Sequence, residues 1–111
     1  PSLVDLAGFE IPDWLDGTSI KPQLAEPSTP RPAAISSYGE GNTSIRTERW
    51  RYIRYEDDSE ELYDHKADPD EWTNLANKPK HKETKLRLIK MIPADQHPGL
   101  KVQTWFDKYQ K

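Results

Sequence analysis

Cysteine is absent from this chain of 111 residues, and no long apolar run occurs in it. The lack of cysteine excludes disulfide bonds, thiolate chemistry and cysteine-based zinc sites. No apolar stretch approaches the ~18 residues of a membrane-spanning helix, so we expect no membrane partner. A signal-peptide pattern is also missing. If the chain is a fragment, this absence says nothing about where the parent protein resides.

Apolar residues are scarce as well. Hydrophobic residues make up 33% of the chain and charged residues 32%, and there are ten prolines, whereas globular domains are usually ~45–50% apolar. Four tryptophans, five tyrosines and a clear strand periodicity nevertheless argue against a disordered chain. We therefore expect one folded domain with a modest core that docks onto something larger.

The common catalytic and nucleotide-binding motifs are missing too, including the phosphate-binding loop, the zinc-protease helix and the nucleophile elbow. The three histidines, His65, His81 and His97, are far apart and have no second metal ligand at a helical or hairpin spacing. The acidic run at residues 56–61 lacks the alternating ligands and central glycine of a calcium loop. We expect no metal site in this chain and interpret the acidic run as a solvated hairpin tip.

Four arginines interleave with aromatic residues between positions 46 and 55, as in some proteins that bind single-stranded nucleic acid. The net charge is −3, acidic neighbours cancel the local field, and alternation distributes the arginines over both faces of a strand. We therefore expect no nucleic-acid partner. Contact of one or two of these arginines with a sulfated sugar stays open, because a guanidinium suits planar or tetrahedral oxyanions.

The chain is organised around residues 43–63, where β-branched and aromatic runs alternate with short charged turns. Successive strand side chains point to opposite faces, so Trp50 and Tyr52 share one face, and Ile53 and Tyr55 share the other. Large side chains on both faces need cover on both sides. Strands joined by hairpins into an antiparallel sheet are predicted at residues 33–38, 43–47, 50–55 and 60–64.

Short helical and irregular segments precede the predicted sheet. Residues 3–7 suit the last turns of a helix that ends at Gly8, and residues 11–24 are predicted to be irregular. Residues 25–32 are interpreted as an extended, proline-rich linker. Three apolar residues of the irregular segment are expected to anchor it: Leu15, Ile20 and Leu24.

After the sheet, residues 80–92 predict a helix, with Pro79 in its first turn and Pro93 ending it. Its apolar stripe consists of Leu86, Ile89 and Ile92. Residues 93–111 are interpreted as a tail that folds back onto a surface. The predicted fold class is therefore α+β, a small antiparallel sheet of about four strands with one C-terminal helix packed on one face.

Two runs carry a resemblance to a known family: SIRTERWRYIRY at residues 44–55 and EELYDHKADPDEWTNLA at residues 60–76. They resemble the C-terminal segment of type I sulfatases, nearest to the iduronate-2-sulfatase-like branch found in bacteria. The opening LVDLAGFEIPDWLDGTSIKPQL also looks like the lead-in of that family, and the similarity covers roughly residues 1–92. The resemblance implies that residues 1–32 end a catalytic-domain helix and lead through a linker into a C-terminal subdomain at residues 33–92.

The resemblance implies a two-part sulfuric ester hydrolase whose large N-terminal catalytic domain is the partner of this chain. In that family a formylglycine, made from Cys or Ser in a (C/S)-x-P-x-R motif, attacks sulfur beside a bound calcium ion, and a sulfated carbohydrate is a candidate ligand. The nearest motif in this chain, Ser28-Thr29-Pro30-Arg31-Pro32, places its arginine one position too early. We expect this chain alone to contain no catalytic residue and no cofactor, and its parent to be periplasmic or secreted.

The resemblance also places the loop before residue 44 at the border of the substrate cleft. The candidate substrate-binding residues are Tyr38, Asn42, Thr43 and Arg46. Many members of that family have histidine where this chain has Thr43, which weakens a role for that position in binding sulfate or sugar. Arg46 is alternatively expected to form a structural salt bridge to Asp64 or Glu61.

The segment after the last predicted strand is expected to be structural. Trp72 and Leu75 lie three residues apart, as on a single helical turn, and with Asn74 they are interpreted as a cap that holds this segment on the sheet. A different hypothesis for the whole chain is an autonomous binding module for sulfated glycans. It would use Trp50, Tyr38 and the nearby arginines.

Overall fold

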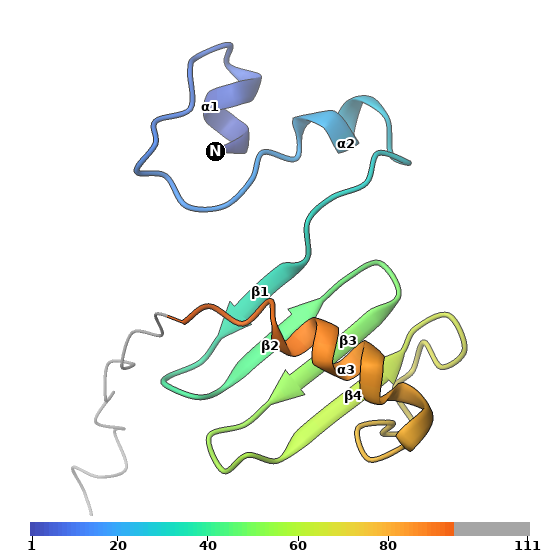
Figure 1. The fold of residues 1–111 in the computed structure, drawn as a ribbon. Coiled ribbons are helices and arrows are strands. Elements are labelled where there is room, and N and C mark those ends of the chain that lie inside the picture. The colour runs from blue at the N-terminus through green and yellow to red at the C-terminus, as the bar shows by residue number, and fades with distance from the viewer. Residues whose placement is uncertain (95–111) are drawn as a thin grey trace, which may run out of the picture. The chain divides into compact units, whose positions relative to one another are not determined.

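The structure, a computed structural model, describes residues 1–94 and divides into two compact units, residues 1–32 and the part of the chain that begins at Ala33 (Figure 1). The boundary coincides with the end of the predicted proline-rich linker. Most of the predicted tail, from residue 95 onward, lies outside the described residues. No helix among residues 1–94 has the length and apolar character needed to cross a membrane.

The first unit contains two short helices, α1 (Ser2–Leu6) and α2 (Lys21–Ala25). The predicted helix end at Gly8 is confirmed: Gly8 has a φ of +79°, and its amide donates to the carbonyl of Asp5 at 3.0 Å. The amide of Phe9 donates to the carbonyl of Val4 at 3.1 Å, so α1 ends in a Schellman motif, which favours glycine at this position.

Polar contacts rather than a core hold the first unit together. The Asp5 carboxylate accepts hydrogen bonds from Ser19 Oγ at 2.7 Å and Lys21 Nζ at 2.9 Å. None of residues 1–32 is buried. The prediction that Ile20 and Leu24 anchor the segment is wrong, since they are 45% and 59% exposed. The irregular prediction also missed α2, whose first turn contains a proline.

The second unit contains a four-stranded antiparallel sheet in the order β1-β2-β3-β4, as predicted (Figure 1). The register places Ile45 of β2 opposite Tyr52 of β3, which in turn lies opposite Leu62 of β4. The strands are β1 (Ala34–Ser37), β2 (Thr43–Arg46), β3 (Trp50–Arg54) and β4 (Glu60–Asp64).

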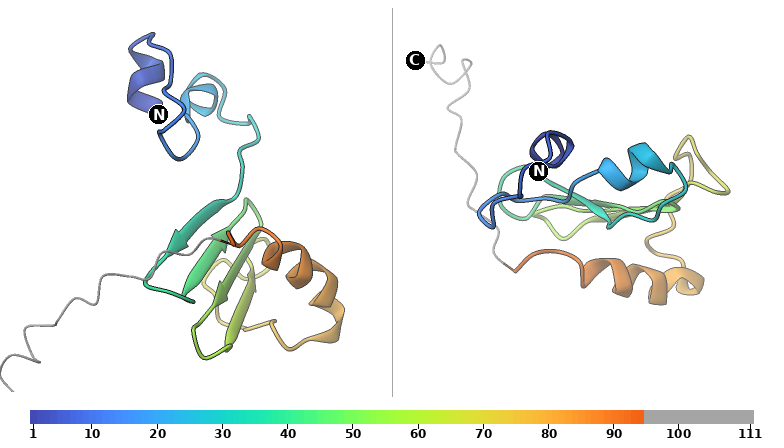
Figure 2. Two further views of the ribbon diagram at one scale, coloured as in Figure 1. Left: turned by 60° about the vertical axis from the view of Figure 1, so that its left-hand side comes forward. Right: turned by 90° about the horizontal axis from the view of Figure 1, so that it is seen from above.

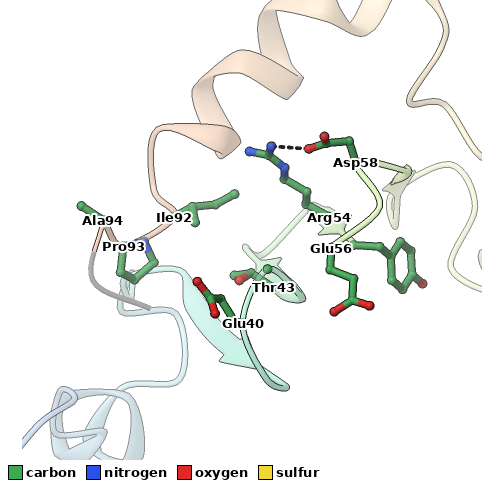
Figure 3. A pocket seen from close by; sticks show the side chains of 10 residues that line it. Glu40, Thr43, Arg54, Glu56, Asp58, Ile92, Pro93 and Ala94 are labelled. Atoms are coloured by element: carbon green, nitrogen blue, oxygen red, sulfur yellow. Dashed lines mark hydrogen bonds and ion pairs between the residues drawn. The ribbon is translucent and has the colours of Figure 1, made fainter. Parts of the chain in front are cut away.

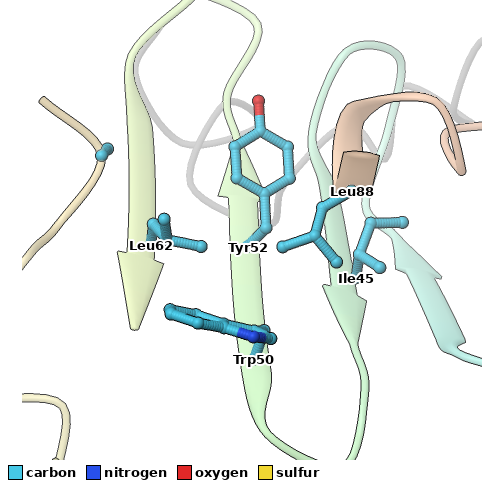
Figure 4. Packing of buried hydrophobic residues seen from close by; sticks show 6 residues of the cluster. Ile45, Trp50, Tyr52, Leu62 and Leu88 are labelled. Atoms are coloured by element: carbon cyan, nitrogen blue, oxygen red, sulfur yellow. The ribbon is translucent and has the colours of Figure 1, made fainter. Parts of the chain in front are cut away.

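One face of this sheet is covered by a 3₁₀ turn, η1 (Pro79–His81), and by helix α3 (Lys82–Ile89), which lies along it in Figure 2. The core between them consists of Ile45, Trp50, Tyr52, Leu62, Ala76 and Leu88 (Figure 4). The predicted apolar stripe of the helix is confirmed at Ile89 and Ile92, which pack against the core, and is wrong at Leu86, which is 48% exposed while Leu88 is fully buried. Leu88 and Lys85 lie three residues apart on the side of the helix that faces the sheet. Leu88 is fully buried there, and the Lys85 ammonium binds Glu60 of β4 at 2.6 Å.

The opposite face of the sheet, which we call the outer face, carries residues from the alternate positions of the strands: Ser44, Arg46, Arg51, Ile53, Glu61 and Tyr63. Each is intermediate in burial. The prediction that Trp50 and Tyr52 share a face distinct from that of Ile53 is confirmed, because the first two are buried under α3 and Ile53 lies on the outer face. The α+β fold class is also confirmed.

Candidate functional site at the paired hairpin loops

Two hairpin turns meet at one end of the sheet. In an antiparallel meander the first and third turns lie at the same end, so the β1–β2 turn at residues 38–42 lies beside the β3–β4 turn at residues 55–59. Together with the segment after α3 they surround a pocket of about 400 Å³ (Figure 3). Its lining residues are Glu40, Gly41, Thr43, Arg54, Tyr55, Glu56, Asp58, Ile92, Pro93 and Ala94.

The β1–β2 turn is shaped by glycine. The Tyr38 amide donates to the Asn42 carbonyl at 3.0 Å and closes the turn, while Gly39 and Gly41 have φ values of +66° and +83°. A Cβ on Gly41 would lie 3.0 Å from the Cα of Glu56. The two turns therefore approach each other at a distance that only glycine permits without a shift.

Asn42 ties the two turns together. Its side-chain oxygen accepts a hydrogen bond from the Glu56 amide at 3.3 Å, and its side-chain nitrogen donates to the Glu40 carbonyl at 3.4 Å. The β3–β4 turn is closed by the Tyr55 amide, which donates to the Ser59 carbonyl at 3.0 Å. These bonds fix the relative position of the turns, and with it the shape of the pocket.

The four candidate residues are not gathered at one point. Thr43 lines the pocket and is 2% exposed, and Asn42 lies directly beside it in the chain. Tyr38 is 85% exposed and does not line the pocket. Arg46 lies at the other end of β2, about 10 Å along the strand from Thr43, and its side chain points to the outer face.

The pocket wall is acidic, which sequence analysis did not anticipate. Glu40, Glu56 and Asp58 contribute carboxylates, whereas Arg54 contributes the one cation of the lining (Figure 3). Arg54 already donates to Asp58 at 2.5 Å, and this hydrogen bond raises the pKa of the guanidinium. The sequence did contain a signal, the acidic run, but its place at the pocket depends on which turns share an end of the sheet.

A partly buried chain of polar side chains lies between the helix and the sheet near this end of the sheet. Tyr52 donates its hydroxyl to Glu60 at 2.6 Å, and Lys85 donates to the other oxygen of that carboxylate at 2.6 Å. Burial, followed by the hydrogen bond to Glu60, raises the pKa of Tyr52. Burial alone would raise the pKa of Glu60, but the bonds from Lys85 and Tyr52 outweigh it and lower that pKa. Both groups are thus held in one protonation state as structural links.

The predicted salt bridge of Arg46 to Asp64 or Glu61 is wrong. Arg46 donates to the Thr47 carbonyl at 2.6 Å and to His65 Nδ1 at 2.9 Å, while Asp64 is bound by Arg49 instead. Because a guanidinium only donates, His65 accepts at Nδ1. His65 Nε2 therefore donates to Glu71 at 2.6 Å, and Arg51 binds the same carboxylate at 3.3 Å. Arg46 thus begins a paired network on the outer face.

Trp50 is unsuited to stack on a sugar. It is 8% exposed, with the Arg49 guanidinium 4.8 Å from its ring centroid on one side and the His81 ring at 5.5 Å. Asn74 forms the predicted structural cap, accepting from the Leu62 amide at 3.1 Å, but Trp72 is 85% exposed and takes no part in it. Residues 1–94 contain no group of three or more acidic, histidine or cysteine residues that could hold a metal ion.

Comparison with known proteins identifies the domain. Residues 1–97 match the family described as N-sulphoglucosamine sulphohydrolase, C-terminal. The chain is 33% identical over 93 residues to a sulfatase of Formosa agariphila, with 83% of this chain and 18% of that protein covered. It is 40% identical over 88 residues to a choline-sulfatase of Rhizobium meliloti, with 72% of this chain and 17% of that protein covered.

A solved structure shows the same fold. BT4656 in complex with its substrate D-glucosamine-2-N,6-O-disulfate superposes with a TM-score of 0.68 and 32% identity, covering 81% of this chain and 21% of that one. The chain therefore spans about a fifth of the length of the relatives it matches. It belongs to the family of sulfatase C-terminal domains.

Proposed function

We propose that this chain is the C-terminal domain of a formylglycine-dependent sulfuric ester hydrolase, where it supports the catalytic domain and borders the substrate cleft. The observation that carries the proposal is the family match over residues 1–97. The relatives are sulfatases about five times longer than the matched segment. The formylglycine, the calcium ion and all bond-breaking chemistry are assigned to the catalytic domain of the parent.

The residues of this chain support that division. The sequence has no cysteine, and its nearest motif, at Ser28, has the wrong spacing. The Ser28 hydroxyl donates to Glu26 at 2.8 Å in an exposed turn before the second unit. Its one acidic neighbour, Glu26, is itself exposed and belongs to the same turn, so this serine lacks the oriented base that activates a nucleophile.

The border of the cleft is assigned to the loop from Tyr38 to Thr43. Asn42 offers a short polar side chain there, Thr43 lies beside it with 2% of its surface exposed, and the bonds of Asn42 to both turns hold the loop in one shape. Arg46 serves the fold rather than the substrate, because its guanidinium is occupied by His65 and backbone carbonyls. The acidic rim favours a substrate that presents its sulfate elsewhere, toward the catalytic domain.

The substrate class that we propose is a sulfated carbohydrate. BT4656 binds a sulfated glucosamine, and a Δ4,5-hexuronate-2-O-sulfatase of Bacteroides thetaiotaomicron is 35% identical to this chain over 91 residues. The second of these relatives supports placement near the iduronate-2-sulfatase-like branch. The autonomous glycan-binding module loses its main support, since Trp50 is buried and Arg49, Arg51 and Arg54 are all paired.

The test compares the isolated chain with the parent polypeptide that includes the catalytic domain. Both are incubated with 4-nitrocatechol sulfate and with sulfated glucosamine, and release of sulfate is measured. We expect turnover by the parent and none by the 111-residue chain. Turnover by the isolated chain would contradict the assignment of the chemistry to the catalytic domain, and a parent that hydrolyses no sulfate ester would contradict the proposed function.

A further inference from the structure

The basic residues of this chain are unevenly distributed. Of the 16 lysines and arginines, six fall within residues 78–90, where Glu83 is the one acidic residue. The whole chain nevertheless has a net charge of −3, so this segment stands out against an acidic background. We call it the basic segment, and it consists of Lys78, Lys80, Lys82, Lys85, Arg87 and Lys90.

The basic segment runs from the residue before η1 to the residue after α3, and most of its charge is exposed to solvent. Lys85 binds Glu60 of the sheet at 2.6 Å, but the other five cations of the basic segment are exposed. Within residues 1–94 those five form no ion pair, in contrast to Arg49, Arg51 and Arg54 of the sheet. Their charge is therefore available to a ligand.

A groove of about 560 Å³ lies beside this charge, between α3 and the segment that leads into η1. Lys82, Leu86 and Ile89, at spacings of four and three residues, line it from the helix, and Lys78 and Pro79 line it from the other side. Glu60 is the one acidic residue of the lining, and its carboxylate is already bound by Lys85, which also lines the groove. The groove thus combines an apolar floor with ammonium groups at its rim.

This combination suits a particular chemistry. A pyranose ring has an apolar C–H face and carries sulfate or carboxylate groups at its edge, so the ring fits the floor while its anions reach the lysines. A single-stranded nucleic acid is matched less well, because its bases need aromatic platforms and no aromatic residue lines the groove. Lysine also binds tetrahedral oxyanions as a point charge without a fixed geometry.

We propose that the groove and the exposed cations of the basic segment bind an anionic, sulfated polysaccharide at a site separate from the pocket at the hairpin loops. The choice of a sulfated glycan over another polyanion rests on the proposed function. The site holds a polymeric substrate near the enzyme, while a small sulfate ester does not need it.

The test uses the parent polypeptide with the double substitution Lys78→Gln/Lys82→Gln. The matched control is Arg31→Gln/Lys66→Gln, which removes the same charge from two exposed residues outside the basic segment. Binding to heparin and to desulfated heparin is measured by titration at several salt concentrations, after thermal unfolding has shown that both variants are folded. We expect about a tenfold loss of heparin affinity in the first variant and less than twofold in the control.

Steady-state kinetics distinguish a failure of this binding site from a failure of the proposed function. We expect kcat/KM on a small sulfate ester to stay within twofold in both variants, while KM on the sulfated polymer rises in the first variant alone. Three results would overturn the proposal: desulfated heparin binds as tightly as heparin, the control variant loses as much heparin affinity as the first variant, or single-stranded DNA binds more tightly than heparin. If the parent binds heparin through these lysines but hydrolyses no sulfate ester, the proposed function fails and the binding site stands.

Discussion

At the scale of single residues, the buried carboxylate of Asp64 at the end of β4 shows how charge is used in this domain. It accepts hydrogen bonds from Arg49 Nε at 2.8 Å and Arg49 Nη2 at 2.6 Å, and from the Lys66 amide at 3.1 Å. The bonds from Arg49 lower the pKa of Asp64 from 3.8 to about 2. The pair therefore links the turn before β3 to the end of β4 as long as the carboxyl is ionised.

The sign of the resulting pH dependence follows from the lowered pKa. Because the folded carboxyl has the lower pKa, its contribution to stability is fully present above about pH 4 and is lost as the pH falls toward about 2. We expect Asp64→Asn to lower the urea midpoint at pH 7 and to flatten the loss of stability between pH 4 and pH 2. The exposed Asp70→Asn serves as the control, and an unchanged acid limb in Asp64→Asn would contradict this assignment.

At the scale of elements, the meeting of the two hairpin turns depends on Gly41. Alanine at this position would strain a backbone with a φ of +83° and would also place its Cβ 3.0 Å from Glu56. Gly39 offers a matched control, since its φ is +66° but a Cβ there meets nothing within 4 Å. The two substitutions share the backbone strain and differ in the contact between the turns.

We expect Gly39→Ala to lower the free energy of unfolding by about 1 kcal/mol, the ordinary cost of a left-handed alanine. Gly41→Ala is expected to cost clearly more, and in the parent it should also lower kcat/KM because the cleft border shifts. Chemical unfolding and steady-state kinetics give the two measurements. Equal effects of the two substitutions would show that the close approach of the turns contributes neither to the free energy of unfolding nor to kcat/KM.

The elements themselves could be predicted well, because alternating apolar residues in 43–63 determine both the strands and the buried face. β4 matches its predicted range of residues 60–64, and the other strands end within one residue of theirs. The inward position of Leu88 in place of Leu86 could not be predicted, since the side of α3 that packs on the sheet also carries Lys85, whose partner Glu60 is 25 residues away. The partner of Arg46 and the acidic pocket wall likewise depend on which strands and turns the register brings together.

At the scale of the whole molecule, the two units differ in how they are held together. The second has a buried core under α3, whereas the first buries no residue and exposes large apolar side chains. Leu3, Phe9 and Trp14 are 83%, 71% and 79% exposed. Fully burying one such side chain stabilises a protein by about 1.5–3 kcal/mol, so these residues are suited to a protein surface that covers them.

The parent supplies that surface if residues 1–32 are the end of its catalytic domain. The isolated chain, which lacks the catalytic domain, then serves as the control for a substitution made in both proteins. We expect the double substitution Phe9→Ser/Trp14→Ser to leave the unfolding midpoint of the isolated chain unchanged, because both side chains are already exposed there. In the parent the same change should lower stability by several kcal/mol. Thermal or urea unfolding of both proteins gives the comparison. If the substituted parent is as stable as the unsubstituted one, these side chains stay in water and the catalytic domain docks elsewhere on this chain.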